Sequence, residues 1–151
     1  MTLSIQFYHL TRDPLEVALP KILEKAYGQK MRVLIKTESA ESAEALSTQL
    51  WTYRQESFLP HGTAAEGQAE LQPILLSPEL APANGATLWL LTDGTEIAPG
   101  TEGVERVLDM FNGLDDEATA RARARWKNYK EAGYELSYFK QTETGGWEKA
   151  A

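Results

Sequence analysis

The sequence predicts an α/β protein, in which one domain is built around an open, mostly parallel sheet flanked by helices. Short apolar runs typical of buried strands alternate with longer segments whose apolar residues recur every three or four positions. Each of these helical segments separates two strands, an order that normally leaves the strands parallel. The chain has 151 residues, the usual size of one domain, so residues 1–151 are expected to form a single domain with about five to seven strands.

The N-terminal part reads as a β-α-β unit. Residues 3–10 combine alternation with β-branched and aromatic side chains, which predicts a first strand. A helix to residue 28 follows, opened by Asp13 as a capping residue. Pro20 lacks the N–H that a helix interior needs, so a kink or a later start is expected there. Residues 31–36 are a compact apolar run and form the second strand.

The middle of the chain carries one helix and three strands. Residues 39–53 have the period of a helix, whereas 54–72 have no sustained period and are interpreted as a long surface loop. Two short apolar runs, 73–77 and 86–92, are typical of interior strands. Residues 104–111 fit a strand or a helix by pattern, and we interpret them as a strand.

The clearest helix lies near the C-terminus. Residues 114–132 have acidic residues at their start and basic residues in their later turns, and Gly133 follows. Residues 135–142 then alternate like a final strand. Residues 143–151 are expected to form a flexible tail, because chain ends without apolar periodicity are usually frayed.

Composition excludes several classes of protein. The chain has no cysteine, which rules out disulfides, thiolate metal sites and a cysteine nucleophile. The N-terminus lacks the basic segment of a signal peptide, and no run reaches the about 18 apolar residues of a membrane span, so we expect a cytoplasmic protein. The net charge of −7 opposes binding to nucleic acid, so contact with DNA is expected to be local or made through another protein.

Motifs for catalysis or nucleotide binding are absent from the sequence. It has neither a phosphate-binding loop nor G-x-G-x-x-G after the first strand, and neither G-x-S-x-G nor H-E-x-x-H. We therefore expect no cofactor, no metal and no catalytic residue. The alternative is a small α/β enzyme that uses His9 or Asp93, because both end predicted strands, where such enzymes place their sites. A polar residue closing a strand and an Asp-Gly turn explain the same two positions without catalysis.

The late helix has two distinct faces at 100° per residue. The inner face carries Ala118, Ala122, Tyr129 and Ala132, and the opposite face carries Arg123, Lys127 and Lys130. Trp126 lies at the border between them. A basic stripe beside a large ring suits an acidic peptide with an apolar anchor, because charge steers the encounter and the ring gives burial. A solvated helix face whose cations stabilise the helix dipole is the alternative.

A second group of aromatic residues surrounds the end of the preceding helix. Trp51 is followed by a segment that contains Phe58, Pro60 and His61. Large rings beside a loop form either an exposed surface for a partner or a small separate core beneath that loop. Spacing alone leaves both interpretations open.

Four segments together resemble the chi subunit family of bacterial DNA polymerase III, over nearly the whole chain. They are FYHL, MRVLIK, LWTYRQESFLPHG and ARWKNYKEAGYEL. The resemblance implies a Rossmann-like sheet without a phosphate-binding loop. It also implies a non-catalytic accessory subunit of the clamp-loader complex, which acts in DNA replication.

The resemblance also implies two partners. In this family the acidic, phenylalanine-ended C-terminal tail of single-stranded DNA-binding protein binds the late helix, at positions that match Arg123, Trp126 and Lys127, with Lys130 adjacent. The psi subunit binds the aromatic patch, at positions that match Trp51 and Phe58, with Pro60 and His61 in the neighbouring loop. The tail GGWEKAA is longer than in the enterobacterial pattern, and a helicase or another clamp-loader component is the alternative to psi at this patch.

Overall fold

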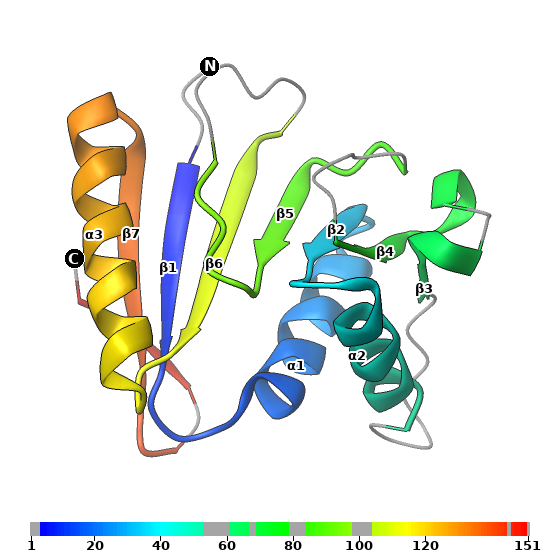
Figure 1. Ribbon diagram of the computed structural model, residues 1–151, viewed down its shortest axis with the longest axis horizontal. Coiled ribbons are helices and arrows are strands. Elements are labelled where there is room, and N and C mark those ends of the chain that lie inside the picture. The colour runs from blue at the N-terminus through cyan, green and yellow to red at the C-terminus, as the bar shows by residue number, and fades with distance from the viewer. Residues whose placement is uncertain are drawn as a thin grey trace.

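Eight strands form a single sheet in the computed structural model, which describes residues 4–52, 61–66, 69–78, 84–97, 104–144 and 146–150 (Figure 1). The strand order is β3-β4-β2-β5-β6-β1-β7-β8, and every neighbouring pair is parallel except β7 and β8. The strands are β1 (Ser4–Leu10), β2 (Val33–Lys36), β3 (His61–Thr63), β4 (Ile74–Ser77), β5 (Leu88–Leu91), β6 (Arg106–Asn112), β7 (Glu135–Gln141) and β8 (Trp147–Lys149). The open, mostly parallel α/β class predicted from the sequence is confirmed.

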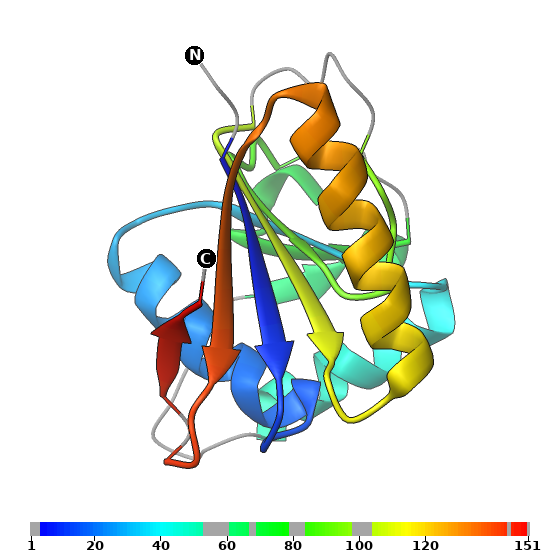
Figure 2. The same cartoon turned by 90° about the vertical axis from the view of Figure 1, so that its left-hand side faces the viewer.

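Helices cover both faces of the sheet. Two of them, α1 (Leu15–Gly28) and α2 (Ala40–Thr52), pack on one face, and α3 (Asp116–Ala132) lies along β6, β1 and β7 on the other (Figures 1 and 2). Short 3-10 helices, η1 (Ala64–Glu66) and η2 (Ala69–Leu71), follow β3. No helix among the described residues is both long enough and apolar enough to cross a membrane.

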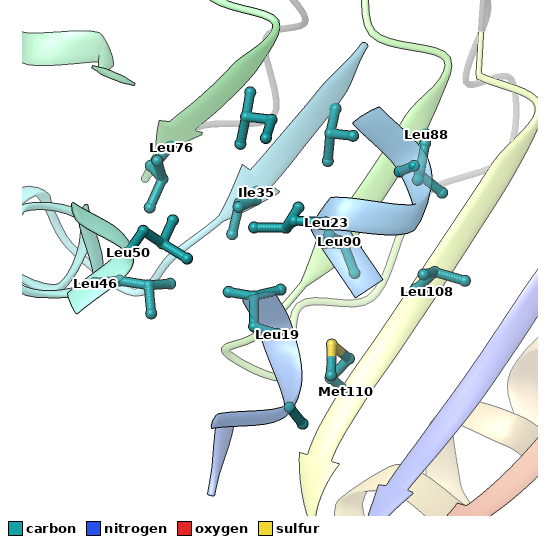
Figure 3. Packing of buried hydrophobic residues seen from close by; sticks show 14 of the residues in the cluster. Leu19, Leu23, Ile35, Leu46, Leu50, Leu76, Leu88, Leu90, Leu108 and Met110 are labelled. Atoms are coloured by element: carbon teal, nitrogen blue, oxygen red, sulfur yellow. The ribbon is translucent and has the colours of Figure 1, made fainter. Parts of the chain in front are cut away.

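The core under α1 and α2 is aliphatic. Leu19 and Leu23 of α1 are fully buried, and they point toward side chains of the central strands (Figure 3). Strand residues alternate between the two faces, so Ile35 belongs to this core while its neighbour Leu34 belongs to the core under α3. A short strand can therefore be apolar throughout because it is covered on both sides.

The core under α3 is aromatic. Phe7 of β1 is fully buried and makes edge-on contacts with Phe111, Trp126 and Tyr129 at centroid distances of 6.5, 5.4 and 6.0 Å. Tyr138 of β7 stacks on Phe7 at 6.4 Å. Edge-on and offset contacts at these distances add to the energy of burial, so this cluster holds α3 on the end of the sheet where β1 and β7 lie.

Three features differ from the sequence prediction. The loop predicted for 54–72 contains β3, whose three residues pair with β4, and the C-terminal tail carries β8, for which no strand was predicted. Both strands have three residues, too few for a period to be recognised, which is why eight strands replace the expected five to seven. The first helix begins at Leu15 with Pro14 as its cap, so Pro20 lies inside it and Asp13 does not cap it through its side chain.

Replacing Leu23 by alanine should lower the free energy of unfolding by about 2–5 kcal/mol, because it leaves a cavity in the aliphatic core. Val17 on the same helix is 38% exposed, and Val17→Ala should change stability by less than about 0.5 kcal/mol. Urea denaturation followed by circular dichroism measures both. Equal losses for the two variants would contradict the packing of α1 described above.

Candidate partner-binding surfaces

The sequence stabilises both ends of α3. The Asp115 carboxylate accepts hydrogen bonds from the backbone N–H groups of Glu117 and Ala118 at 3.0 and 3.4 Å. This satisfies donors that a helix start otherwise leaves unpaired. At the other end Gly133 adopts a left-handed conformation with φ of 88°, which glycine accepts without strain. The most certain helix of the sequence prediction is confirmed, with its first helical residue at Asp116.

A buried ion pair sets the rotation of α3 against the sheet. Arg125 Nε and Nη2 donate to the Asp109 carboxylate of β6 at 2.7 and 2.9 Å. Asp109 is 0% exposed and Arg125 is 6% exposed. Burial raises the pKa of Asp109, and the hydrogen bonds and charge of Arg125 oppose this shift. Because a two-pronged contact has one geometry, Arg125 fixes which side of α3 faces the sheet.

The side of α3 opposite this pair carries the predicted cations. Ala122 and Tyr129 are buried as expected, and Arg123, Lys127 and Lys130 are exposed. Ala132, predicted to face the core, is exposed instead, although Tyr129 in the same last turn of α3 is buried. The cationic face, defined as Arg123, Trp126, Lys127 and Lys130, is thus formed as the sequence suggested, with Trp126 half-buried at its border.

Trp126 joins the cationic face to the aromatic core. Its ring meets Phe7 at 5.4 Å and Tyr138 at 5.7 Å, both edge-on. The residue is only half-buried, so part of the indole remains accessible beside the cations. This arrangement provides an apolar contact that is held in place by neighbouring rings and bordered by positive charge.

His9 lies next to the same cluster and is tied to Tyr138. His9 Nδ1 and the Tyr138 hydroxyl are hydrogen-bonded, and the His9 ring lies 4.9 Å from that of Phe111. Burial lowers the pKa of His9, and Lys140 and Arg123 lower it further. No local sequence pattern points to Tyr138 or Lys140, because their proximity to His9 arises from the pairing of β1 with β7.

At the other end of the sheet, Trp51 and His61 form a second surface. Their rings lie 4.0 Å apart, tilted by 34°, and Trp51 is 50% exposed while His61 is 4% exposed. His61 Nε2 donates to the carbonyl oxygen of Ser47 in α2 at 3.0 Å, which anchors the ring. Phe58 and Pro60, predicted to belong to the same patch, lie outside the described residues.

Among the described residues, the cavities that Asp93 lines do not include His9, the other residue of the alternative enzyme hypothesis. Asp93 lines two cavities of about 300 and 220 Å³, and His9 lines neither. Burial acts to raise the pKa of Asp93, but hydrogen bonds from Lys36 and Thr95 hold it below its usual value. The Asp93 carboxylate is paired with Lys36 at 2.6 Å at the end of a strand. An ionised carboxylate in such a pair fits a structural role better than proton transfer. In the part of the chain that the structure describes, no three His, Asp or Glu side chains are grouped to hold a metal.

The two surfaces lie at opposite ends of the molecule. Strand order places β3 at one edge and β7 with β8 at the other, and Figure 1 shows α2 and α3 at the two ends of the sheet. A partner bound at one surface therefore leaves the other accessible.

Comparisons with known proteins match almost the entire chain. The family model described as DNA polymerase III chi subunit, HolC, matches residues 1–137. The chain is 33% identical over 138 residues to the DNA polymerase III subunit chi of Pseudomonas aeruginosa, covering 87% of this chain and 92% of that protein. It is 28% identical over 138 residues to the Escherichia coli subunit chi, covering 87% and 93%. A probable subunit chi of Rickettsia prowazekii is 32% identical over 95 residues, covering 63% of this chain and 58% of that protein.

Arg125→Met should lower the free energy of unfolding by about 3–5 kcal/mol, because it leaves the buried Asp109 carboxylate without its partner. The loss should shrink as the pH falls, since protonation removes the unpaired charge. Arg121→Met on the same helix is the matched control, because Arg121 is 66% exposed and its ion pair is with the exposed Glu117. Urea denaturation at several pH values compares the two. Losses of the same small size would show that the buried pair does not hold α3.

Proposed function

Because the chain belongs to the DNA polymerase III chi subunit family, we propose that it is a non-catalytic accessory subunit of the polymerase's clamp-loader complex. In this proposal it links that complex to single-stranded DNA-binding protein by holding the acidic C-terminal tail of that protein. The role belongs to DNA replication in the cytoplasm, requires no metal or cofactor, and involves nucleic acid only indirectly.

The cationic face of α3 is the observation that carries this proposal. The chain has a net charge of −7, yet Arg123, Lys127 and Lys130 are exposed together along one helix face. A tail rich in carboxylates is attracted to this face and not to the rest of the acidic surface. The accessible part of Trp126 offers an apolar contact for the terminal phenylalanine of the tail, which gives the burial that charge alone lacks.

The surface at Trp51 is proposed as the contact with the rest of the complex. The partner is the psi subunit, or in its place another clamp-loader component or a helicase, and the proposed contact residues are Trp51, Phe58, Pro60 and His61. The Trp51 ring is half-exposed and is held in place by its contact with the ring of the buried His61. This favours the assignment, because a large aromatic ring held in a fixed position is typical of the centre of an interface.

The separation of the two surfaces also supports a linking role. A molecule with partners at opposite ends joins two assemblies without either one covering the other site. Two modest contacts held in one assembly raise each other's effective concentration, so strong binding at either end is not needed. The alternative of a small enzyme at His9 and Asp93 lacks a common cavity among the described residues.

Reversing two charges on α3 should abolish binding of the acidic tail. Arg123→Glu combined with Lys127→Glu should weaken binding of a tail peptide by at least about tenfold, because like charges then face each other. Calorimetric titration measures this at low and high salt, and the wild-type affinity should fall as salt screens the attraction. Arg121→Glu is the matched control, since it removes a cation of α3 that lies outside the cationic face.

Unchanged affinity in the double variant, or an equal loss in Arg121→Glu, would reject the cationic face as the binding surface. Circular dichroism of each variant shows whether the fold is kept.

Trp51→Ala should remove the chain from the clamp-loader complex while costing at most about 1.5 kcal/mol of stability, because half of the ring is already exposed. Co-purification of a tagged chain with clamp-loader subunits, identified by mass spectrometry, measures association. Tyr27→Ala is the control, as Tyr27 is a 39% exposed aromatic residue on α1, a different helix from that of Trp51. A stability loss of about 3–5 kcal/mol would instead identify Trp51 as a core residue.

A further inference from the structure

Both ring nitrogens of His9 have partners. The Gly113 backbone bonds to the ring, and because the Gly113 N–H donates to the Leu10 carbonyl at 2.7 Å, the group that faces His9 is the Gly113 carbonyl. A Cβ at Gly113 would overlap Cδ2 and Nε2 of the ring, so the edge of the ring that carries Nε2 faces Gly113. Nδ1 then accepts from the Tyr138 hydroxyl when the ring is neutral.

Two cations act on this pair of rings. Lys140 lies beside His9 in the register of β1 and β7, and Arg123 approaches from α3. Both lower the pKa of His9, and Arg123 also acts to lower that of Tyr138 against the effect of burial. The polar groups that act on His9 are thus the Gly113 carbonyl, the Tyr138 hydroxyl and the side chains of Lys140 and Arg123. Both of the charged groups among them are cations. Positive charges from β7 and α3 thus act on His9, and Arg123 also acts on the Tyr138 hydroxyl, which can donate a hydrogen bond.

We propose that Arg123, Tyr138, Lys140 and His9 form a carboxylate subsite that extends the cationic face of α3 across the sheet. The inference rests on the proposed function, since its ligand is a carboxylate of the same acidic tail. Tyr138 contacts Trp126 at 5.7 Å, so a peptide whose apolar residue packs on Trp126 brings a neighbouring carboxylate within reach of Arg123 and the Tyr138 hydroxyl.

The subsite couples ligand binding to a proton. To donate to a bound carboxylate, the Tyr138 hydroxyl must turn away from His9 Nδ1, and Nδ1 keeps its hydrogen bond only by taking a proton and donating to the Tyr138 oxygen. A bound carboxylate also offsets the repulsion from Arg123 and Lys140. Binding therefore raises the pKa of His9, and the tail binds more tightly as the pH falls through the histidine range.

Two of the four subsite residues lie past the end of the family model's match, and His9 and Arg123 lie within it. The family model matches residues 1–137, so Tyr138 and Lys140 lie past the end of the match. They are placed by β7, which pairs with β1 over six registered positions.

Calorimetric titration with an acidic, phenylalanine-ended tail peptide at about pH 5.5 and about pH 8 tests the proposal, since peptide carboxylates stay ionised at both values. Wild-type affinity should be at least about threefold tighter at the lower pH. His9→Gln should remove this difference, because glutamine can still donate to the Gly113 carbonyl but does not titrate. Tyr138→Phe keeps the ring contacts and should reduce the difference, because only the direct effect of the bound carboxylate on His9 then remains.

Lys140→Gln should weaken binding at both pH values. Lys149→Gln is its matched control and should have no effect, because Lys149 pairs with Phe139 and lies on the opposite face of the sheet.

The outcomes separate this inference from the proposed function. Equal wild-type affinity at the two pH values, with binding still lost on charge reversal of the cationic face, would overturn the subsite alone. A pH dependence that persists in His9→Gln would overturn it as well. Absence of binding at both pH values would overturn the function and the subsite together. If His9→Gln does not fold, NMR measures the pKa of His9 in the wild-type chain with and without the peptide. A pKa that is the same in both would contradict the proposal.

Discussion

The buried pair of Asp109 and Arg125 is the interaction on which the candidate surface depends. It joins the middle of β6 to α3 with two hydrogen bonds in a region from which water is excluded. A charge buried this deeply is stable only with its partner, so the helix has one favoured rotation. That rotation turns Arg123 and Lys127 outward and leaves Trp126 at the border.

The fold separates the two candidate surfaces. Its strands are held by pairing that is parallel from β3 to β7 and antiparallel between β7 and β8, with aliphatic packing under α1 and α2 and aromatic packing under α3. At the strand ends, where many α/β enzymes hold a nucleotide or substrate, Asp93 is paired with Lys36. A fold that is common among enzymes is thus compatible with a protein whose candidate binding surfaces lie at the two ends of its sheet.

Much of the fold and the cationic face could be predicted from the sequence. The periodicity of apolar residues and the residues typical of helix ends can both be recognised within a short stretch of sequence. Arg125 was missed although its spacing from Ala122 and Tyr129 places it on the inner face, and Asp109 within an apolar strand signals the need for a partner. The contact of His9 with Tyr138 joins residues 129 positions apart and depends on strand order, which no local pattern encodes. Strands β3 and β8, with three residues each, are shorter than any recognisable period.

The measurement that tests this account most directly is mapping of backbone amide shifts in the isotope-labelled chain as an acidic, phenylalanine-ended peptide is added. The account predicts that the largest changes follow the outward side of α3 around Arg123 and Trp126 and extend to the ends of β1 and β7. Changes centred on α1 or α2, with α3 unaffected, would contradict it.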